Sequence, residues 1–594
     1  MERILVSAGW RDRQANVALV SDYGAIGNGV ADDTAAIQAA LNNTKGAPVE
    51  FSSAGTYKIS GTLNIPSGRI VRGNGARIVS DRYMHTVFAV AGTADPLDVN
   101  LVGSYNAGAH TLRTAVPHRL TVGETFRLVG QRCAASIDAP PSDRLGMSTS
   151  NTGTPWFGEY LTVREVPSPT EVVVSSGLIF NGYRDNKTQE THTNARERTT
   201  LNRITWNENT LIEGFSIAVS NTYSIRLELA KDCVVRDITE TRPNDIGYVV
   251  GTCGAYRCLV QDVHTKYASA RPDTVNYYAR NQFKVMNSQQ VVIDRCTADG
   301  GSQVVDMTYL SAFMIPTIAC VVRNCTFTGF DSNGVTLHPG VWGAIIENNE
   351  FRFSNFKETA SGIGVRAPYS VIRNNRLRGA VRTGTTGTFL SGGSYGIHCF
   401  DGGGHHLLVT GNTVEGFDYS FGSSDGNEVA ERHGELHIHV EGNYFHNFLT
   451  AIRIIRGNAA LSTTWTALSV AGNWFSTDKD DACGIHTSNG TAQGTRGMSI
   501  TGNHMHFSGS RPIPVRVGAR TRDPIITGNV VTGTATFLIE TQPGANNGTI
   551  ATAANVVAGP SGTQMFPALA AGTGPGAVQI TPDTAVAGAY WIGD

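Results

Sequence analysis

The sequence predicts an all-β fold, a parallel β-helix in which short strands stack into a solenoid. A strand-and-turn motif recurs along the second half of the chain, and a further strand with alternating apolar residues follows in each repeat. The composition agrees with this fold, because 67 glycines and only 16% charged residues in a 594-residue chain indicate one continuous β body rather than linked globular domains.

The first predicted element is a short amphipathic helix after the turn SDYGAIGNGVADDT. Asp32 or Asp33 can cap its start, and apolar residues follow at helical spacing. A solenoid needs such a cap because an uncovered terminal coil exposes its core and its unpaired strand edges. We therefore expect residues 1–94 to contain an N-terminal segment, the capping helix and the first coils. The apolar face of this helix is Ile37, Ala40 and Leu41.

Residues 95–185 interrupt the repeat with alternating strands separated by glycine turns, such as VGETFRLVG and GEYLTVREV. This pattern indicates a small inserted β-domain. We expect residues 186–550 to form the main parallel β-helix with the active groove. Residues 551–594 are rich in Gly, Ala, Pro and Thr and are expected to form a C-terminal tail or cap.

The repeat is clearest at one turn, found in IIENNEF, VIRNNRL, LVTGNTV, HVEGNYF, SVAGNWF, SITGNHM and IITGNVV. The second turn position is Asn each time, and successive separations are 26, 37, 31, 30, 30 and 26 residues. Asn tolerates left-handed backbone angles, and stacked Asn amides can hydrogen-bond along the axis, so we predict a structural ladder rather than catalytic residues. The predicted members are Asn349, Asn375, Asn412, Asn443, Asn473, Asn503 and Asn529.

A second strand in each unit, as in GVTLHPG, GIGVRAP and GIHCFDG, defines an inside and an outside by its alternation. The side-chain loops 379–394 and 417–435 are expected to flank the outer face. The residues predicted to fill the core are Val335, Leu337, Ile363, Val365, Ile397 and Cys399.

Stacking would place equivalent outward residues about 4.8 Å apart, a spacing that lets one row follow several units of a linear polymer. Two neighbouring columns result from aligning the second strands. The first column is Asp306, Thr336 and His398, the second is Thr308, His338, Arg366 and Phe400, and Arg453, His486 and Arg516 continue the face. Lys284 and Asp245 are expected on the preceding coils.

Acidic and basic residues nearly cancel, 49 against 47, so no overall field favours nucleic acid or an anionic membrane. No apolar run approaches the length of a membrane span, and the start MERILVSAGWRDRQ lacks an apolar signal-peptide core. We expect no membrane insertion and no Sec export. The nine cysteines show no CxxC spacing, which favours reduced, mostly buried thiols over disulfides or zinc. The HIH at 437–439 and the HMH at 504–506 are interpreted as structural, so no metal and no cofactor are expected.

For hydrolysis, two carboxylates must flank the glycosidic bond, and Asp306 can pair with one of several acidic residues. Asp331 and Glu358 can instead cap turns. Elimination on a uronate needs a Lys, Arg, His or Tyr base and a cation. The candidate catalytic residues are Asp306, His338, Arg366, Asp245 and Glu358, with Asp331 and Asp401 as further carboxylates. The candidate substrate-binding residues are Lys284, Tyr309, Trp342, His398, Asp401 and Arg453; each of the aromatic rings could equally close a hydrophobic core.

The segment DYGAIGNGVADDTAAIQAAL and the strand pair YKISGTLNIPSGRIVRGNGARI resemble the N-terminal element of the pectate-lyase-like β-helix superfamily, especially bacteriophage tailspike depolymerases. The resemblance is close over residues 20–90 and looser in the repeats. It implies a right-handed parallel β-helix, a homotrimer attached to the virion tail, and action outside the bacterial host. His338 lies in a turn similar to that of mannuronan epimerases, but Thr336 stands where their reaction uses Asp.

Three functional hypotheses follow. The first is a tailspike-like depolymerase that cleaves a bacterial capsule, exopolysaccharide or O-antigen, by endo-hydrolysis with paired carboxylates. The second is a polysaccharide lyase that acts on a uronate-containing polymer. The third is a carbohydrate-binding adhesin without catalysis.

Overall fold

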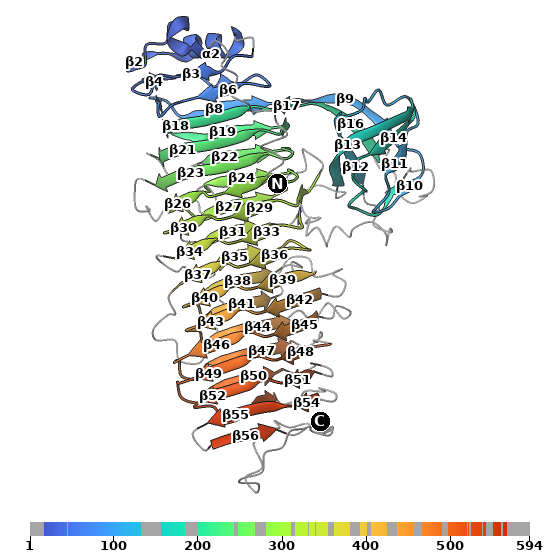
Figure 1. Cartoon of the computed structure of the whole chain (residues 1–594), viewed down its shortest axis with the longest axis vertical. Helices are drawn as coiled ribbons and strands as arrows, with labels where there is room; N and C mark the ends of the chain where they lie inside the picture. Colours follow the sequence, from blue (N-terminus) through green and yellow to red (C-terminus); the bar gives the residue numbers. More distant parts are fainter. Residues whose placement is uncertain are drawn as a thin grey trace. The chain divides into compact units, whose positions relative to one another are not determined.

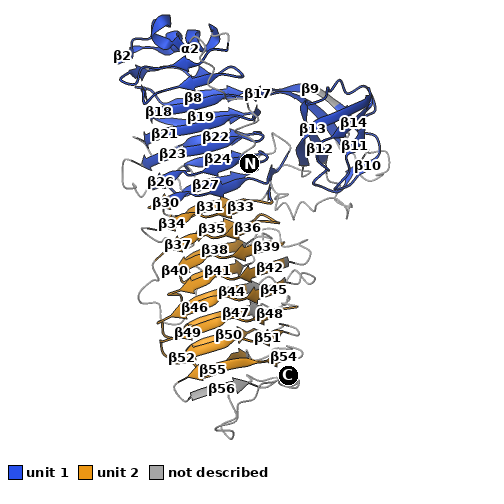
Figure 2. Cartoon of the chain, viewed as in Figure 1, with its two compact units in different colours: residues 1–326, 339–342 blue, residues 327–338, 343–594 orange. Residues whose placement is uncertain are grey.

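In the computed structural model, the described residues run from 17 to 566 and divide between two compact units, residues 1–326 with 339–342 and residues 327–338 with 343–594 (Figure 2). The ranges left out within that span are 44–45, 132–155, 185–198, 243–246, 268–280, 310–314, 331, 339, 354–360, 380–392, 401–405, 425–435, 457–465, 490–496, 519–520, 522–523, 537, 542–550 and 560–561.

Unit 1 begins with the 3-10 helix η1 (Val20–Tyr23) and the helix α2 (Thr34–Asn43), which lies at the end of the strand stack (Figure 1). The Asp32 carboxylate accepts the backbone N–H of Thr34 at 3.0 Å, whereas the Asp33 carboxylate accepts those of Ile26 and Gly27. The predicted apolar face of the helix is confirmed, because its three residues are fully buried. They are Ile37, Ala40 and Leu41.

Two parallel sheets form the coils of unit 1. One sheet carries the candidate site, and its strands in unit 1 are β5 (Leu63–Asn64), β8 (Met84–Ala91), β19 (Asn221–Glu228), β22 (Tyr248–Cys253), β24 (Phe283–Met286) and β27 (Gln303–Thr308). The other sheet contains β1 (Ala18–Leu19), β2 (Asn28–Asp32), β3 (Val49–Glu50), β4 (Thr56–Lys58), β6 (Ile70–Arg72), β7 (Arg77–Val79), β18 (Leu211–Ala218), β21 (Val234–Arg242), β23 (Leu259–Tyr267), β25 (Val292–Asp294), β26 (Thr297–Asp299) and β29 (Val321–Arg323). Short parallel pairs are β17 (Asn207–Glu208) with β20 (Ala230–Lys231) and β28 (Thr317–Ile318) with β32 (Val341–Trp342).

Between β8 and β17 the chain leaves the coils and forms antiparallel strands around a separate core (Figure 1). The six-stranded sheet has the order β11-β14-β13-β12-β16-β9, and β10 pairs with β15. The core includes Phe126, Phe157 and Leu201. The strands are β9 (Thr93–Asn100), β10 (Ser104–Tyr105), β11 (Thr111–Arg113), β12 (Thr125–Gln131), β13 (Trp156–Ser168), β14 (Glu171–Val174), β15 (Tyr183–Arg184) and β16 (Thr200–Thr205). The antiparallel region therefore extends from residue 93 to residue 205.

Unit 2 repeats the coil with two parallel strand rows. The row of longer strands contains β31 (Asn333–Leu337), β35 (Ser361–Val365), β38 (Tyr395–Phe400), β41 (Tyr419–Ser424), β44 (Thr450–Arg456), β47 (Cys483–Asn489), β50 (Ile513–Val517) and β53 (Ile539–Thr541). The strands on either side of the Asn turn are β33 (Ile345–Glu347), β34 (Glu350–Arg352), β36 (Val371–Arg373), β37 (Arg376–Arg378), β39 (Leu407–Thr410), β40 (Thr413–Glu415), β42 (Leu436–Glu441), β43 (Tyr444–His446), β45 (Thr466–Ala471), β46 (Trp474–Thr477), β48 (Ser499–Thr501), β49 (His504–Phe507), β51 (Ile525–Thr527), β52 (Val530–Gly533), β54 (Ala551–Ala553) and β55 (Asn555–Gly559). β30 (Thr326–Thr328) spans the division between the units, and β56 (Gly562–Phe566) pairs antiparallel with β55.

The core of unit 2 follows the predicted alternation. All six predicted core side chains are at most 1% exposed, and they are Val335, Leu337, Ile363, Val365, Ile397 and Cys399. The predicted loop 417–435 is corrected, however, because its first part contains the strand β41. The sequence there, DYSFGSS, has only two large apolar side chains, Tyr419 and Phe421, among glycine and polar residues, so the period-2 pattern was weak.

The Asn ladder is confirmed in unit 2. Each side-chain amide donates to the Oδ1 of the next rung at 2.9–3.0 Å, and the backbone N–H of each rung donates to the same oxygen. Asn555 adds a rung that the repeat did not predict. The left-handed backbone belongs to the preceding turn position, as in Asn348, Asn374 and Gly411, so the ladder selects Asn for its amide and not for its backbone freedom.

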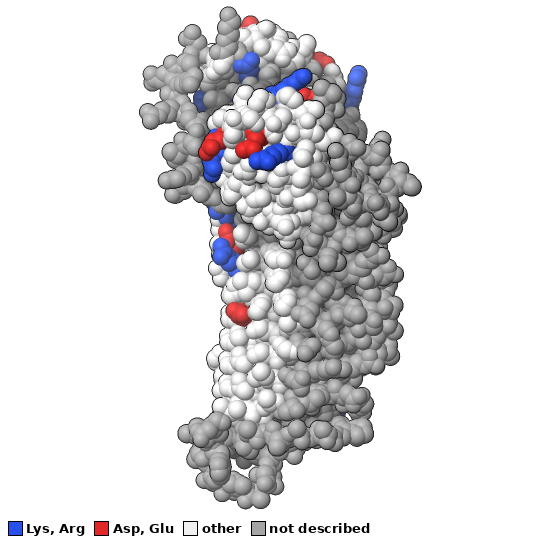
Figure 3. Space-filling view, turned by 90° about the vertical axis from the view of Figure 1, so that its right-hand side faces the viewer, with Lys and Arg blue, Asp and Glu red and all other residues white. Residues whose placement is uncertain are grey.

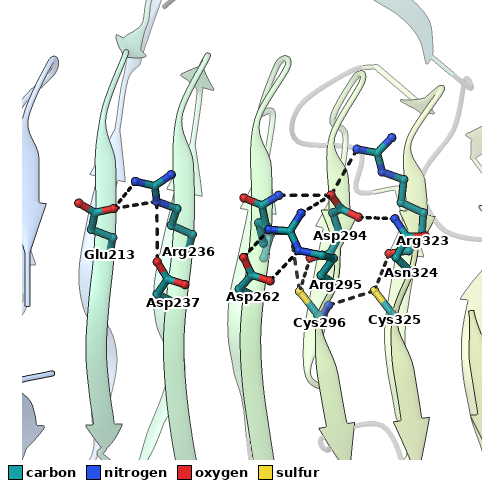
Figure 4. A network of polar contacts seen from close by, with 12 residues as sticks. Glu213, Arg236, Asp237, Asp262, Asp294, Arg295, Cys296, Arg323, Asn324 and Cys325 are labelled. Atoms are coloured by element: carbon teal, nitrogen blue, oxygen red, sulfur yellow. Dashed lines mark hydrogen bonds and ion pairs between the residues drawn. The ribbon is translucent and has the colours of Figure 1, made fainter. Parts of the chain in front are cut away.

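At two corresponding turns of unit 1 the ladder position is cysteine (Figure 4), whereas Ile238 and Val263 follow the left-handed Asp237 and Asp262 at two others. The backbone N–H of Cys296 points to the Sγ of Cys325 at 3.4 Å. Ion pairs run along the outer side of the same strands: Asp262 with Arg295, Asp294 with Arg323, and Glu213 with Arg236. The eight cysteines among the described residues are buried, as predicted.

The described charged residues visible in Figure 3 alternate in sign, and the face drawn there shows no extended patch of one charge. This agrees with the balanced composition. Within the described ranges, no helix has the length and apolar character needed to cross a membrane.

Candidate functional site

An outward row on β19, β22, β24 and β27 of unit 1 brings polar residues of successive coils into register. Arg226 pairs with Gly251, Gly251 with Lys284, and Lys284 with Asp306. The predicted neighbourhood of Lys284 and Asp306 is therefore present on adjacent strands. Position 251 is the one member of this row without a side chain.

Asp306 lies buried beneath this row, with 3% of its surface exposed. Its Oδ2 accepts the Lys284 ammonium at 2.6 Å and the Asn281 amide at 3.0 Å. Burial alone would lower the pKa of Lys284, but the charge of Asp306 and hydrogen bonds to Asp306 and Tyr248 outweigh it, and the pKa lies above its ordinary value. Lys284 consequently keeps its positive charge.

Two stacked tyrosines fix the cations of this row. The rings of Tyr223 and Tyr248 lie 5.1 Å apart at 21°. The Lys284 ammonium lies 5.3 Å from the centre of the Tyr248 ring, and the Arg226 guanidinium lies 5.5 Å from that of Tyr223, both within cation–π range. A Cβ on Gly251 would approach the Tyr223 ring to 2.4 Å, so glycine leaves the space that this ring fills.

Unit 2 has its own outward row in register over eight strands. The row contains Thr336, Gly364, His398, Gly422, Arg453, His486, Arg516 and Glu540. The prediction that Thr336 and His398 share a column, continued by the C-terminal cations, is confirmed. Arg516 forms an ion pair with Glu540 at 2.6 Å.

A second tyrosine pair lies beside this row. Tyr395 and Tyr419 have ring centres 4.8 Å apart, and His398 stacks on Tyr395 at 3.9 Å and 5°. The Arg453 guanidinium lies 4.4 Å from the centre of the Tyr419 ring and hydrogen-bonds both tyrosines. A Cβ on Gly422 would come within 2.3 Å of the Tyr395 ring.

The imidazoles of this row are neutral at pH 7. Burial, with the charges of Arg366 and Arg453, lowers the pKa of His398 to about 3. Burial, with the charges of Arg516 and Arg453, lowers the pKa of His486 to about 3. Burial raises the pKa of Tyr419 to about 12. The positive charge of the row therefore comes from its arginines.

The two units thus repeat one arrangement at six matching positions. We call Tyr223, Arg226, Tyr248, Gly251, Lys284 and Asp306 the unit 1 cluster, and Tyr395, His398, Tyr419, Gly422, Arg453 and His486 the unit 2 cluster. The four tyrosines were missed from the sequence. Each tyrosine lies three residues before the residue of its own strand that belongs to the outward row. A search for tyrosines at this spacing, on strands one or two coils before a cation, would have found them.

Glu240 is a buried carboxylate of unit 1 that sequence reasoning also missed. It is 1% exposed and pairs in register with Thr265, whose hydroxyl donates to Gln282 at 2.5 Å. Since Gln282 follows Asn281, this polar set adjoins the residues that hold Asp306.

The other predicted residues fall into three groups. His338 and Arg366 follow the strands β31 and β35, and the bond from the Arg366 N–H to the Leu337 carbonyl, 2.9 Å, keeps them on adjacent coils. Trp342 contacts Phe180 edge-on with ring centres 5.1 Å apart, and with Tyr309 it packs against the core of the antiparallel region, as the core alternative expects. Asp245, Asp331, Glu358 and Asp401 lie outside the described residues.

No group of three potential metal-ligating side chains occurs within the described part of the chain. The first histidine of each His-x-His segment has a ring partner. His437 stacks on His406 at 4.8 Å, and His504 stacks on Trp474 at 3.9 Å.

Residues 17–91 match the family model Rhamnogalacturonase A/epimerase, pectate lyase-like. No curated protein sequence matches the chain. The tailspike protein gp49 from Pseudomonas phage LKA1 has 15% identity and a TM-score of 0.56, over 90% of this chain and 84% of that one. The tailspike gp61 from Pseudomonas phage phi297 has 15% identity and a TM-score of 0.53, over 92% and 84%. Residues 17–91 are thus similar to a pectate-lyase-like model, and the chain has the right-handed parallel β-helix fold that these two tailspike structures share.

Proposed function

We propose that this chain binds and cleaves a bacterial surface polysaccharide along the outward rows that contain the unit 1 cluster and the unit 2 cluster. The observation that carries the proposal is the repeated cluster of fixed tyrosines and cations, with Asp306 beside Lys284 in unit 1. Matching side chains on adjacent coils repeat about every 4.8 Å, which suits an extended polymer better than a small ligand. The fold shared with two tailspike proteins supports the same class of substrate.

Hydrolysis is the reaction proposed for unit 1. Lys284 and Asn281 both donate to Asp306, and these bonds orient the carboxylate for the role of nucleophile or general base. The second carboxylate is proposed to be Glu240 or the sequence-predicted Asp245, both of which belong to unit 1. One carboxylate would protonate the leaving oxygen while the other attacks the sugar or activates water.

β-Elimination is the second candidate, because the unit 2 cluster supplies its parts. A neutral His398 can accept a proton, a protonated tyrosine can donate one, and Arg453 can neutralise a uronate. The sequence-predicted His338 and Arg366 belong to the same unit and lie on the coils before that of His398. If the reaction is elimination, they are further candidates to assist it.

The test is digestion of a panel of purified capsular, exopolysaccharide and O-antigen polymers. Hydrolysis gives new reducing ends without ultraviolet absorbance, whereas elimination gives reducing ends together with an absorbing unsaturated uronate. The variants Asp306→Asn and Glu240→Gln should lose the hydrolytic products. Tight binding of a polymer without any new reducing ends would instead support the adhesin and overturn the proposal of cleavage.

For the assembly, we propose a homotrimer carried on a phage tail and acting outside the host cell. The tailspike fold supports this proposal. Sedimentation equilibrium should then give the mass of three chains, and a monomer would contradict it.

A further inference from the structure

We propose that Tyr83 and His85 form a further sugar-binding subsite, at the far end of the aromatic row that begins beside Asp306 in unit 1. The inference rests on the proposed function and deepens it, because it gives the bound polymer a direction and a minimum length on one side of the reacting bond. It comes from a series of contacts that continues past the unit 1 cluster to the start of β8.

The contacts of the unit 1 cluster extend from β27 to β8. Asp306 binds Lys284 at 2.6 Å, and the Lys284 ammonium lies 5.3 Å from the centre of the Tyr248 ring. That ring stacks on Tyr223, with centres 5.1 Å apart. The next ring is the imidazole of His85, whose centre lies 5.9 Å from that of Tyr223 at a tilt of 55°. The row therefore reaches one coil beyond the strand that carries Tyr223.

Tyr83 extends this surface and is held at its polar end. The side chain of Tyr83 is 60% exposed, and His85 is exposed as well, whereas Met84 between them is buried. The two rings thus share the outer face of the coil. The Tyr83 hydroxyl hydrogen-bonds the Thr222 hydroxyl at 2.5 Å, and Nδ1 of His85 lies 3.1 Å from the Thr86 hydroxyl. A ring fixed at one polar atom loses little side-chain freedom when a ligand stacks on it.

These rings suit the apolar C–H face of a sugar, because tyrosine and histidine combine an apolar body with a polar edge. The cations farther along the row are matched by carboxylates of the same strands or their neighbours. Arg226 pairs with Glu228 at 2.8 Å, as Lys284 does with Asp306. Binding at the β8 end of the row therefore depends on ring contacts and hydrogen bonds more than on charge.

The position of the subsite sets a length of polymer. The strands follow one another in the order β8-β19-β22-β24-β27 (Figure 1). At about 4.8 Å for each step, the row from Asp306 to Tyr83 is roughly 19 Å long. One sugar unit of an extended chain is about as long as one step, so about four sugars separate Tyr83 from the reacting bond. The polymer thus runs from the unit 1 cluster toward the N-terminal end of unit 1.

The first experiment uses fragments of the polymer found with the panel, prepared by partial acid hydrolysis and sized by mass. For the wild-type chain, kcat/KM should rise with fragment length until a fragment spans the row from Asp306 to Tyr83. For Tyr83→Ala, kcat/KM on the full polymer should fall about tenfold through KM, with kcat unchanged, because a ring far from the reacting bond contributes to binding alone. On the shortest fragment that is cleaved, the two proteins should agree within about twofold. If the polymer is bound without cleavage, the same ratios are expected for dissociation constants.

Further variants separate the ring from its hydroxyl and from general effects of substitution. His85→Ala should act as Tyr83→Ala does. Tyr83→Phe keeps the ring and loses the bond to Thr222, so its kcat/KM on the polymer should fall by less than about threefold. The matched control is Tyr444→Ala, which removes a 39% exposed tyrosine from the other sheet, in unit 2, and should leave kcat/KM on the polymer unchanged.

Three results would overturn the subsite while leaving the proposed function intact. One is an equal kcat/KM of folded Tyr83→Ala and wild-type proteins on the polymer. Another is the same loss on the polymer and on the shortest fragment, which would place the effect at the reacting bond. The third is an equal loss in Tyr83→Phe and Tyr83→Ala, which would exclude stacking on the ring. If no polymer is bound or cleaved at all, the proposed function itself fails.

Discussion

The clusters of unit 1 and unit 2 share a framework of two tyrosines, a glycine and a cation, and differ in what flanks the cation. Unit 1 has Arg226 before the glycine and Asp306 after the cation, where unit 2 has His398 and His486. The conserved part positions side chains by ring stacking and by the space that glycine leaves. The variable part determines charge, so the same framework can hold a carboxylate for catalysis or accept one from a ligand.

The turns of the two units also share a position in the coil and differ in the residue that occupies it. In unit 2 the ladder position carries an amide that links each rung to the next by two hydrogen bonds to one oxygen. In unit 1 the position holds Cys296 and Cys325, whose sulfur is a weak acceptor. There the ion pairs on the outer side of the strands link successive coils instead. Buried amide ladders should contribute more stability than exposed ion pairs.

The largest expected effect tests whether catalysis depends on the unit 1 cluster. Asp306→Asn keeps the shape of the side chain but replaces the carboxylate that accepts the Lys284 ammonium by an amide. We expect turnover of the polymer to fall about 10²- to 10⁴-fold, with binding through the unit 2 cluster retained. Initial rates of reducing-end release measure the effect. Asp262→Asn, which loses an ion pair on the other sheet, is the control, and a rate within threefold of wild type for folded Asp306→Asn would reject the assignment.

The ladder comparison predicts the next largest effect. Asn443→Ala removes the acceptor of the Asn412 amide and backbone N–H and the donor to Asn473, which should lower the free energy of unfolding by about 3 to 5 kcal/mol. Cys296→Ala at the matching turn of unit 1 should cost about 1 kcal/mol, as for deletion of one buried heavy atom. Urea denaturation of both variants measures the difference. Equal losses would show that the two ladders stabilise their units to the same degree.

The coil architecture could be predicted because it repeats. Each rung of Asn375 or Asn412 occupies the same sequence context, and the alternation of Ile363 and Val365 fixes which face is buried. The missed strand β41 shows where this reasoning stops. Its buried Phe421 is flanked by Ser420 and Gly422, so local periodicity could not reveal a strand that its neighbours impose through pairing.

The site was predicted in part. Register follows from counting along strands, so Lys284 with Asp306 and His398 with Arg453 could be placed in rows from the sequence. The tyrosines could not be placed in the same way, because their role depends on ring contacts that cross from one coil to the next. Trp342 shows the converse, since its contact with Phe180 is made by a segment far away in the sequence.

The glycine positions test whether the framework is shared. An added methyl would meet the Tyr395 ring at 2.3 Å in Gly422→Ala and the Tyr223 ring at 2.4 Å in Gly251→Ala. Each variant should displace a tyrosine at a cost of about 1 to 3 kcal/mol, with polymer affinity lowered about tenfold. Gly61→Ala, whose methyl would meet Thr34 at an ordinary 3.5 Å, is the matched control. A loss of affinity in only one of the two variants would show that one cluster does not contact the polymer.

The smallest effect concerns the histidines, which are found only in the unit 2 cluster. His398 and His486 have a pKa of about 3 in the folded chain against about 6.5 when unfolded. Because the unfolded state binds the proton more readily, their contribution to stability is complete above pH 6.5 and is lost as the pH falls toward 3. Between pH 6.5 and 5.5 the loss should be about 1 kcal/mol per histidine. Melting temperatures of wild type and of the double variant His398→Asn, His486→Asn, recorded from pH 7.5 to 5, measure it. The double variant should decline less with acid than wild type, and parallel curves would mean that these imidazoles are not held neutral by burial and by their arginine neighbours.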